Sequence, residues 1–345
     1  MKRKEKMLIS RTNRPRVIIT MGDPAGIGPE LIAKVVASRE IERLATFVII
    51  ADRRLMEDLF EKPVLKNVFF AEISSDKKIP KIEPGYINVI DPGPALGSII
   101  AGKATNAGAK KALDCIDLAV KLIKDNDDKS FAQAIVTAPV NKAAIAEICH
   151  GFMGHTEYLQ EAFGVKRTTM VLSGDRLKVI PLTRHIPLKD VASHVTVDEI
   201  VGTIAQTVEY RRMVAGKDDA VIGVCALNPH GGENGKIGRE EIDLISPAVE
   251  KAKKNYARIE GPIPADVAFY KALQGKLDIV IGMYHDQCLA PFKMLEFETG
   301  VNMTLGLGCV RTSPDHGTAF DIAGKGIASS GSMEQAVRLA IKAIS

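Results

Sequence analysis

The amino-acid sequence predicts an α/β protein with a largely parallel sheet. Short apolar runs rich in β-branched residues recur along its 345 residues. Their near-continuous hydrophobicity suits strands that are buried on both faces because helices cover the sheet. Stretches with helical periodicity separate the runs, and this alternation is typical of α/β folds.

Six runs are predicted as strands, and five stretches are predicted as helices. The clearest helix covers residues 106–124, where apolar residues such as Ala109, Leu113 and Ile116 recur at helical spacing. The predicted strands are 16–20, 47–51, 134–137, 179–183, 221–227 and 278–284. The other predicted helices are 29–37, 197–211, 239–255 and 333–344.

Composition favours a globular protein of the cytoplasm. Hydrophobic residues make up 46% and charged residues 26%, with a formal net charge of +4. Part of this excess lies in the basic residues 1–15, which we expect to form a disordered tip. No aromatic residue interleaves with these charges, which argues against a nucleic-acid platform. No apolar stretch approaches the ~20 residues that span a bilayer. The five cysteines form no CxxC pair, which predicts reduced thiols.

Three predicted strands run into loops that contain a histidine. His185 follows the run at 179–183, His230 follows 221–227, and His285 follows 278–284. Ligands bind beyond the carboxyl ends of strands in open α/β sheets, so three imidazoles there could share one divalent ion. A strand-end histidine also serves as an ordinary hydrogen-bonding residue, and the pattern alone leaves both interpretations open.

Two glycine-rich loops have equally open interpretations. Residues 228–235 read NPHGGENG, which fits either a long surface turn or a backbone that approaches a ligand closely. Residues 21–30 read MGDPAGIGPE and open a helix. They match neither GxGxxG nor GxxxxGK[ST], so they fit either a tight structural turn or an anion-binding helix start.

Several polar residues could bind an anionic ligand. His155 and Thr156 precede an apolar-periodic stretch and could simply cap its helix. Lys293, Asn302 and Arg311 lie in a segment otherwise rich in apolar residues and glycine. Lysine and arginine are the usual partners of phosphate, although each is also a common surface charge.

Taken together, these segments resemble the 4-hydroxythreonine-4-phosphate dehydrogenase family, which includes D-threonate and D-erythronate 4-phosphate dehydrogenases. The resemblance implies a three-layer α/β/α fold of the isocitrate/isopropylmalate dehydrogenase type, with two subdomains and an active-site cleft. It also implies a homodimer with the active site at the subunit interface. The motifs that carry it are GDPAGIGPE, TAPVNK, GHTEYL, TRHIPL, NPHGGENG, GPIPAD, YHDQ and DHGTAFDIAGKG.

The resemblance assigns roles to residues of this sequence. Residues 16–142 and 303–345 are expected to form the cofactor-side domain, and residues 143–302 the metal, substrate and dimerisation domain. The implied metal ligands are His185, His230 and His285. The implied substrate-binding residues are His155, Thr156, Lys293, Asn302 and Arg311. The implied NAD-binding residues are Gly317, Thr318, Ala319 and Asp321.

The expected reaction is the oxidation and decarboxylation of 4-hydroxy-L-threonine 4-phosphate with NAD (NADP is the alternative) and a divalent metal. Zinc, cobalt, magnesium, nickel and manganese are the candidate ions. Asp266 is a candidate proton acceptor, and Lys293 is a second candidate for the chemistry. Asn234 looks more like relatives that act on D-threonate or D-erythronate 4-phosphate, which gives dihydroxyacetone phosphate. A phosphate acyltransferase and a non-catalytic sugar-phosphate-binding protein are alternatives from other classes.

Overall fold

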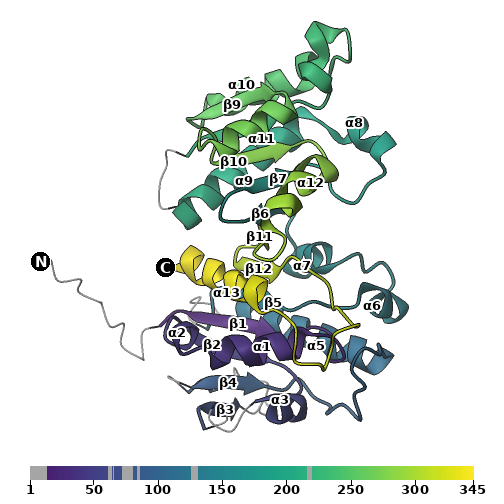
Figure 1. Cartoon of the computed structure of the whole chain (residues 1–345), viewed down its shortest axis with the longest axis vertical. Helices are drawn as coiled ribbons and strands as arrows, with labels where there is room; N and C mark the ends of the chain where they lie inside the picture. The colour runs from purple at the N-terminus through teal and green to yellow at the C-terminus, as the bar shows by residue number, and fades with distance from the viewer. Residues whose placement is uncertain are drawn as a thin grey trace, which may run out of the picture. The chain divides into compact units, whose positions relative to one another are not determined.

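The chain forms two compact units, Met1–Gly164 with Cys309–Ser345 (unit 1) and Val165–Gly308 (unit 2). The computed structural model describes residues 14–60, 64, 66–71, 81–83, 86–125, 131–215 and 220–345 (Figure 1). The predicted domains divide at residues 142 and 302 instead. Helices α6 and α7 pack on α5 within unit 1, so the first unit extends beyond residue 142.

Unit 1 contains an entirely parallel run of strands in the order β3-β4-β2-β1-β5-β12. All residues of β2, β4 and β5 are buried, which requires cover on both faces of the sheet. The strands are β1 (Arg16–Thr20), β2 (Thr46–Ile50), β3 (Val68–Ala71), β4 (Ile87–Ile90), β5 (Ala134–Thr137) and β12 (Val310–Pro314).

Helices α5 and α13 supply much of this cover. α5 contacts β1 and β2, whereas α13 contacts β12 and β5. Thr105 caps α5, since its hydroxyl accepts a hydrogen bond from Gly108 N at 3.0 Å. The helices are α1 (Gly28–Ala37), α2 (Arg39–Glu42), α3 (Arg53–Leu59), α5 (Asn106–Lys124), α6 (Lys142–Ile148), α7 (His155–Phe163) and α13 (Gly331–Ile344).

Unit 2 has a mixed sheet in the order β11-β6-β7-β10-β8-β9. The run from β7 to β9 is parallel, and β6 pairs antiparallel with both β7 and β11. The strands are β6 (Thr169–Ser173), β7 (Lys178–Pro181), β8 (Ile222–Cys225), β9 (Ile259–Ile263), β10 (Ile279–Gly282) and β11 (Val301–Leu305).

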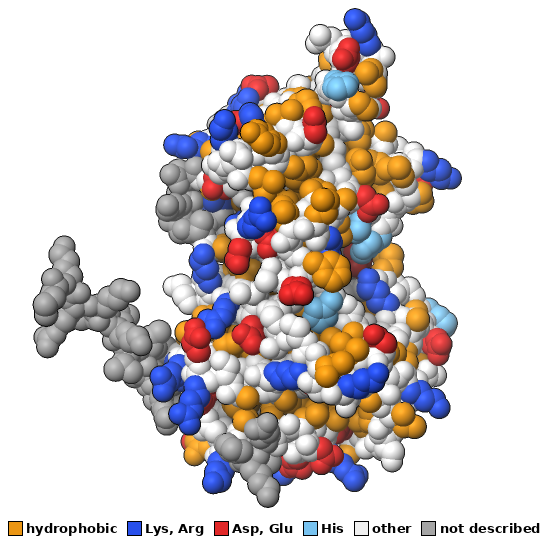
Figure 2. Space-filling view, viewed as in Figure 1, with side chains coloured by type: hydrophobic (Ala, Val, Ile, Leu, Met, Phe, Trp, Pro, Cys, Tyr) orange, Lys and Arg blue, Asp and Glu red, His pale blue; other side chains and the backbone are white. Residues whose placement is uncertain are grey.

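The helices of unit 2 leave some apolar side chains exposed. Figure 2 shows hydrophobic side chains gathered where α11 lies in Figure 1. One predicted helix, at 239–255, begins instead with a π-helical turn before α10. The elements are η2 (Leu188–Asp190), α8 (Val191–His194), α9 (Val197–Ala215), η3 (Pro229–Gly235), η4 (Glu241–Ile245), α10 (Ser246–Lys253), α11 (Ala265–Leu273) and α12 (His285–Glu296).

The structure confirms the predicted α/β class and contains all six predicted strands, with ends that differ by up to two residues. Strands β3, β4, β6, β9, β11 and β12 were not predicted. Several of them carry polar residues; Asn88 in β4, for example, is fully buried and donates to Tyr86 O at 2.9 Å. Most of the predicted N-terminal tip, residues 1–13, lies outside the described residues. No helix in the described part of the chain is long and apolar enough to span a membrane.

Candidate functional site

The carboxyl ends of β7, β10 and β8 lie side by side in unit 2. β10 pairs in parallel with β7 on one side and with β8 on the other. Beyond the strand ends, Leu182 N donates to Gly282 O at 2.8 Å, and Gln287 Nε2 donates to Ala226 O at 2.9 Å. The three histidine-bearing segments therefore leave one edge of the sheet.

His185 and His285 come together at this edge. Their ring centroids are 5.9 Å apart, and both rings line a cavity of about 480 Å³. His285 Nδ1 lies 2.6 Å from Asp286 Oδ1, which favours the tautomer that leaves Nε2 as a metal ligand. Imidazole nitrogens are common ligands of divalent ions, so this pair could supply two of the three predicted metal ligands. The cavity is also lined by Arg184, Ile186, Leu188, Val191, Tyr284 and Asp286.

His230 is held in a left-handed turn that starts beyond β8. Residues 230–234 all have positive φ, between 44° and 75°. This conformation costs roughly 1–2 kcal/mol each for His230 and Glu233, whereas asparagine, as at Asn234, adopts it more readily. Among the described residues, no group of three His, Cys, Asp or Glu side chains is placed to hold a metal ion. Ligation by His230 together with His185 and His285 therefore stays a prediction.

Glu241 anchors the start of this turn, although nothing in the sequence singled it out. Its side chain is 3% exposed, and Oε1 accepts hydrogen bonds from Leu227 N and Asn228 N, both at 2.8 Å. Oε2 accepts a third from Asn228 Nδ2 at 3.0 Å. Burial favours a higher pKa for Glu241, but the hydrogen bonds from Asn228 and Leu227 outweigh it and lower the pKa. In the sequence, Glu241 is simply one of two adjacent glutamates in a predicted helix.

Three further candidates lie in unit 2. Asp266 is exposed in the first turn of α11, just after Pro264, and the left-handed turn approaches that proline at Gly231. Lys293 lies on α12, two helical turns beyond the histidine that begins it, with Nζ 5.4 Å from the Phe297 ring centroid. Asn302 lies on β11, and its Oδ1 is buried with no hydrogen-bond partner in the described structure.

Unit 1 contains the candidate substrate-binding residues His155, Thr156 and Arg311, which together with Thr137 are called the cradle below. Arg311, on β12, is 2% exposed and donates from Nη2 to Thr137 Oγ1 at 2.6 Å. Burial lowers the pKa of Arg311 to about 10, and the Glu157 carboxylate partly opposes that shift. Burial, followed by the charges of Arg311 and Lys142, lowers the pKa of His155 well below its usual range. His155 is consequently neutral at pH 7 beside a buried cation.

The predicted cofactor segment, which contains Gly317, Thr318, Ala319 and Asp321, packs on the start of α1. Thr318 O accepts a hydrogen bond from Ile27 N at 3.0 Å. A Cβ on Gly26 would lie 3.1 Å from Thr318 Cβ, and one on Gly22 would lie 2.3 Å from Pro139 O. Close packing thus accounts for these glycines, which supports the tight-turn interpretation of the loop at 21–30. The role of the segment in cofactor binding stays a prediction.

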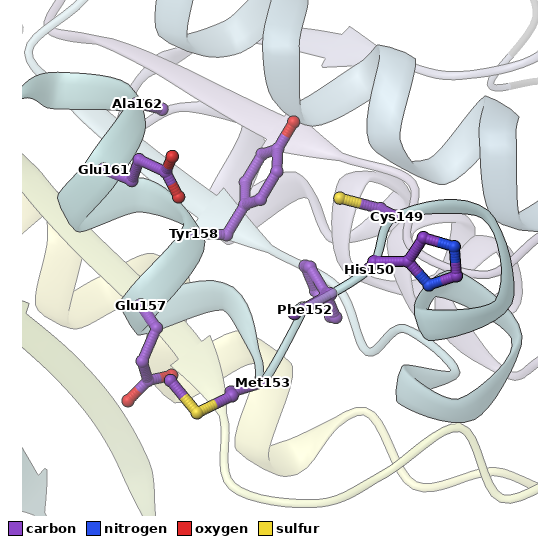
Figure 3. Close-up of a pocket in the computed structure, with 9 residues that line it drawn as sticks. Cys149, His150, Phe152, Met153, Glu157, Tyr158, Glu161 and Ala162 are labelled. Atoms are coloured by element: carbon purple, nitrogen blue, oxygen red, sulfur yellow. The ribbon is translucent and has the colours of Figure 1, made fainter.

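A second cavity, of about 550 Å³, lies beside α7 in unit 1 (Figure 3). Tyr158 donates from its hydroxyl to Asp117 Oδ1 at 2.6 Å and packs against Phe152 with ring centroids 5.6 Å apart. Glu157 and Tyr158 leave α7 in different directions in Figure 3. The lining residues are Cys149, His150, Gly151, Phe152, Met153, Glu157, Tyr158, Glu161 and Ala162.

Known proteins resemble this chain over almost its whole length. Residues 43–340 match the family described as pyridoxal phosphate biosynthetic protein PdxA. The 4-hydroxythreonine-4-phosphate dehydrogenase of Desulfosudis oleivorans is 40% identical, covering 95% of this chain and 96% of the relative. The D-threonate 4-phosphate dehydrogenase of Cupriavidus necator is also 40% identical, covering 94% and 96%.

A crystal structure of 4-hydroxythreonine-4-phosphate dehydrogenase from Klebsiella pneumoniae superposes on this chain with a TM-score of 0.78 at 34% identity. The superposition covers 96% of this chain and 100% of that structure.

Proposed function

The chain belongs to the pyridoxal phosphate biosynthetic protein PdxA family, and on this premise we propose that it oxidises and decarboxylates 4-hydroxy-L-threonine 4-phosphate. The products would be 3-amino-2-oxopropyl phosphate and CO₂, with NAD as the hydride acceptor. The enzyme is a dehydrogenase that takes a phosphorylated small molecule, a nicotinamide cofactor and a divalent metal. The observation that carries the proposal is the pair of imidazoles at the carboxyl edge of unit 2, 5.9 Å apart.

The paired imidazoles of His185 and His285, with His230, would hold the divalent ion. Neutral imidazoles leave the charge of the ion undiminished, and Asp286 holds the His285 ring in place by a 2.6 Å contact. A divalent ion supplies Lewis acidity, which lowers the pKa of the substrate hydroxyl and favours loss of CO₂ from the ketone. Zinc, cobalt, nickel, manganese and magnesium are the candidate ions.

The residues of the chain bind and orient the substrate. Arg311, His155 and Thr156 of unit 1 would bind an anionic group of the substrate, and Lys293 and Asn302 of unit 2 are further candidates for substrate binding. The neutral His155 can donate or accept a hydrogen bond without adding charge. Asp266, exposed at the start of α11, would accept the hydroxyl proton. Gly317, Thr318, Ala319 and Asp321 would contact NAD.

A D-threonate or D-erythronate 4-phosphate is the second candidate substrate, and it would give dihydroxyacetone phosphate and CO₂. Asn234 in the left-handed turn favours it, as does the name of the Cupriavidus necator relative at 40% identity. This substrate carries a hydroxyl where the first carries an amine, so the two reactions differ at one functional group.

We also propose a homodimer, formed through the apolar face of unit 2. Val267, Tyr270 and Leu273 recur at helical spacing on α11 and are 40%, 63% and 43% exposed. Met294, on α12, is 86% exposed, and Phe297 just beyond it is 74% exposed. Both helices pack on β10, and a large exposed apolar patch marks a protein contact surface.

Parallel assays separate the two substrates. NADH absorbance is followed with purified protein, NAD and a divalent metal, using either 4-hydroxy-L-threonine 4-phosphate or D-threonate 4-phosphate. Turnover of the amino acid alone supports the proposal. Preference for D-threonate 4-phosphate would identify that compound as the substrate and leave the proposed reaction type unchanged. Absence of NADH with either substrate in metal-loaded protein would contradict both proposed reactions.

A further inference from the structure

Lys142 is a cation near His155 of the cradle, and the proposed function gives this lysine no role. It is the first residue of α6, and its backbone is fixed by the preceding Asn141, whose Oδ1 accepts a hydrogen bond from Ala144 N at 2.9 Å. The Lys142 side chain is exposed and forms no hydrogen bond or ion pair with the described part of the chain. The start of α6 therefore fixes the backbone of Lys142, and its ammonium group remains available to bind an anion.

Gly154 leaves room for this ammonium at the start of α7. A Cβ at position 154 would lie 3.3 Å from Lys142 Nζ and 3.4 Å from Glu157 Oε2. The backbone at Gly154 is extended, with φ at 160°, so space rather than conformation favours glycine. Gly154 is also the N-cap of α7 and offers no side-chain cap, so the positive end of a nine-residue helix faces the same space.

A buried group next to Lys142 also lacks a partner. His155 Nε2 is buried and makes no hydrogen bond to the described residues. Lys142 lies near His155, because a Cβ on the preceding Gly154 would be 3.3 Å from Lys142 Nζ. The charge of Lys142 also contributes to the lowered pKa of His155, after burial and Arg311. Lys142, the Glu157 carboxylate and the N-terminus of α7 thus lie around Gly154, next to the neutral imidazole of His155.

We propose that Lys142 binds the phosphate group of the substrate together with Arg311 and the first turn of α7. The Glu157 carboxylate offsets the charge of Arg311, so Lys142 supplies the net positive charge that favours an anion. A phosphomonoester carries about −1.5 to −2 charges at pH 7 and gains most from that added charge. This inference rests on the proposed function only in naming the phosphate as part of the substrate.

The competing interpretation is that Lys142 and Glu157 attract each other across Gly154 and simply stabilise the start of α7. Under that interpretation, neutralising Lys142 would leave phosphate binding unchanged. Inorganic phosphate is the probe that separates the two, because it requires neither turnover, metal nor NAD.

The experiment compares Lys142→Gln and Lys142→Arg with a matched control, Lys121→Gln. Lys121 is an exposed cation of the same unit, on α5. The dissociation constant of inorganic phosphate is measured from the imidazole resonance of His155 by NMR. Loss of one charge-assisted hydrogen bond predicts about tenfold weaker binding in Lys142→Gln. Lys142→Arg and the control should bind phosphate within about twofold of the wild type.

Steady-state kinetics give an independent result. Lys142→Gln should raise the KM for the phosphorylated substrate about tenfold and change kcat by less than about twofold. The reason is that the phosphate is bound equally tightly in the ground state and in the transition state. Weaker phosphate binding in Lys142→Gln supports the inference even if neither candidate substrate is turned over, an outcome that would refute only the proposed function. Equal phosphate binding by Lys142→Gln and Lys121→Gln, or no binding by the wild type, overturns it.

Discussion

Replacement of Glu241 should loosen the turn that carries His230. Glu241→Ala removes the acceptor of two partly buried backbone amides, Leu227 N and Asn228 N, and of Asn228 Nδ2. An unsatisfied buried donor costs about 1–3 kcal/mol, so two amides predict a local loss of about 3 kcal/mol. Since 1.4 kcal/mol is a factor of ten, the two amides should exchange with solvent about 100-fold faster.

Native-state amide hydrogen exchange measures this opening at Leu227 and Asn228 directly. Glu241→Gln keeps one oxygen acceptor and should give a smaller acceleration than Glu241→Ala. The matched control is Asp243→Asn, an exposed acid in the same π-helical turn that pairs with Arg239. Exchange rates in Glu241→Ala that equal those of the control would refute the anchoring role.

The pH dependence of exchange provides a second check on Glu241. Hydrogen bonds hold its pKa below the ordinary value of 4.5, so its carboxylate stabilises the folded state above that pH. This stabilisation is lost as the pH falls through the lowered pKa. The wild type should therefore lose amide protection below pH 4.5, and Glu241→Gln should lose little in the same range.

Three other changes have defined outcomes. Gly232→Ala should destabilise the turn by more than about 2 kcal/mol, because its φ is 75° and a Cβ would lie 2.6 Å from Glu241 Oε2; thermal unfolding tests this, and an unchanged Tm contradicts it. His155 should stay neutral throughout pH 6 to 8 in NMR titrations, since burial and then Arg311 lower its pKa, and a midpoint near the ordinary value of 6.5 would be inconsistent with the cradle. Tyr270→Glu should give monomers in sedimentation velocity, whereas a stable dimer would place the interface elsewhere.

Much of the fold could be predicted because its central strands are apolar along their whole length. The run at 16–20 became β1, in which Val17, Ile18 and Ile19 are completely buried. Strand β9 could not be recognised because IEGPI contains glycine and proline, and β12 because VRTSP contains a buried arginine. In β12, the buried Arg311 donates a hydrogen bond to Thr137 of β5, and sequence spacing carries no information about that contact.

The candidate site could be predicted only in part from the sequence. Parallel strands bring their carboxyl ends to one edge, and this topology predicts the meeting of His185 and His285. The left-handed turn that carries His230 packs on Glu241 at Gly232, and helical or strand periodicity does not encode this contact. Lys142 ends the TAPVNK motif, but the sequence assigned it no role, since its proximity to His155 depends on two helices separated by a turn.

The most direct test of the central claim compares His285→Ala with the wild type in an NADH assay, with bound metal measured in parallel. We expect His285→Ala to bind less divalent metal and to lose nearly all turnover of 4-hydroxy-L-threonine 4-phosphate or D-threonate 4-phosphate. Full NADH formation by metal-free His285→Ala would contradict a metal-dependent dehydrogenase built on the paired imidazoles.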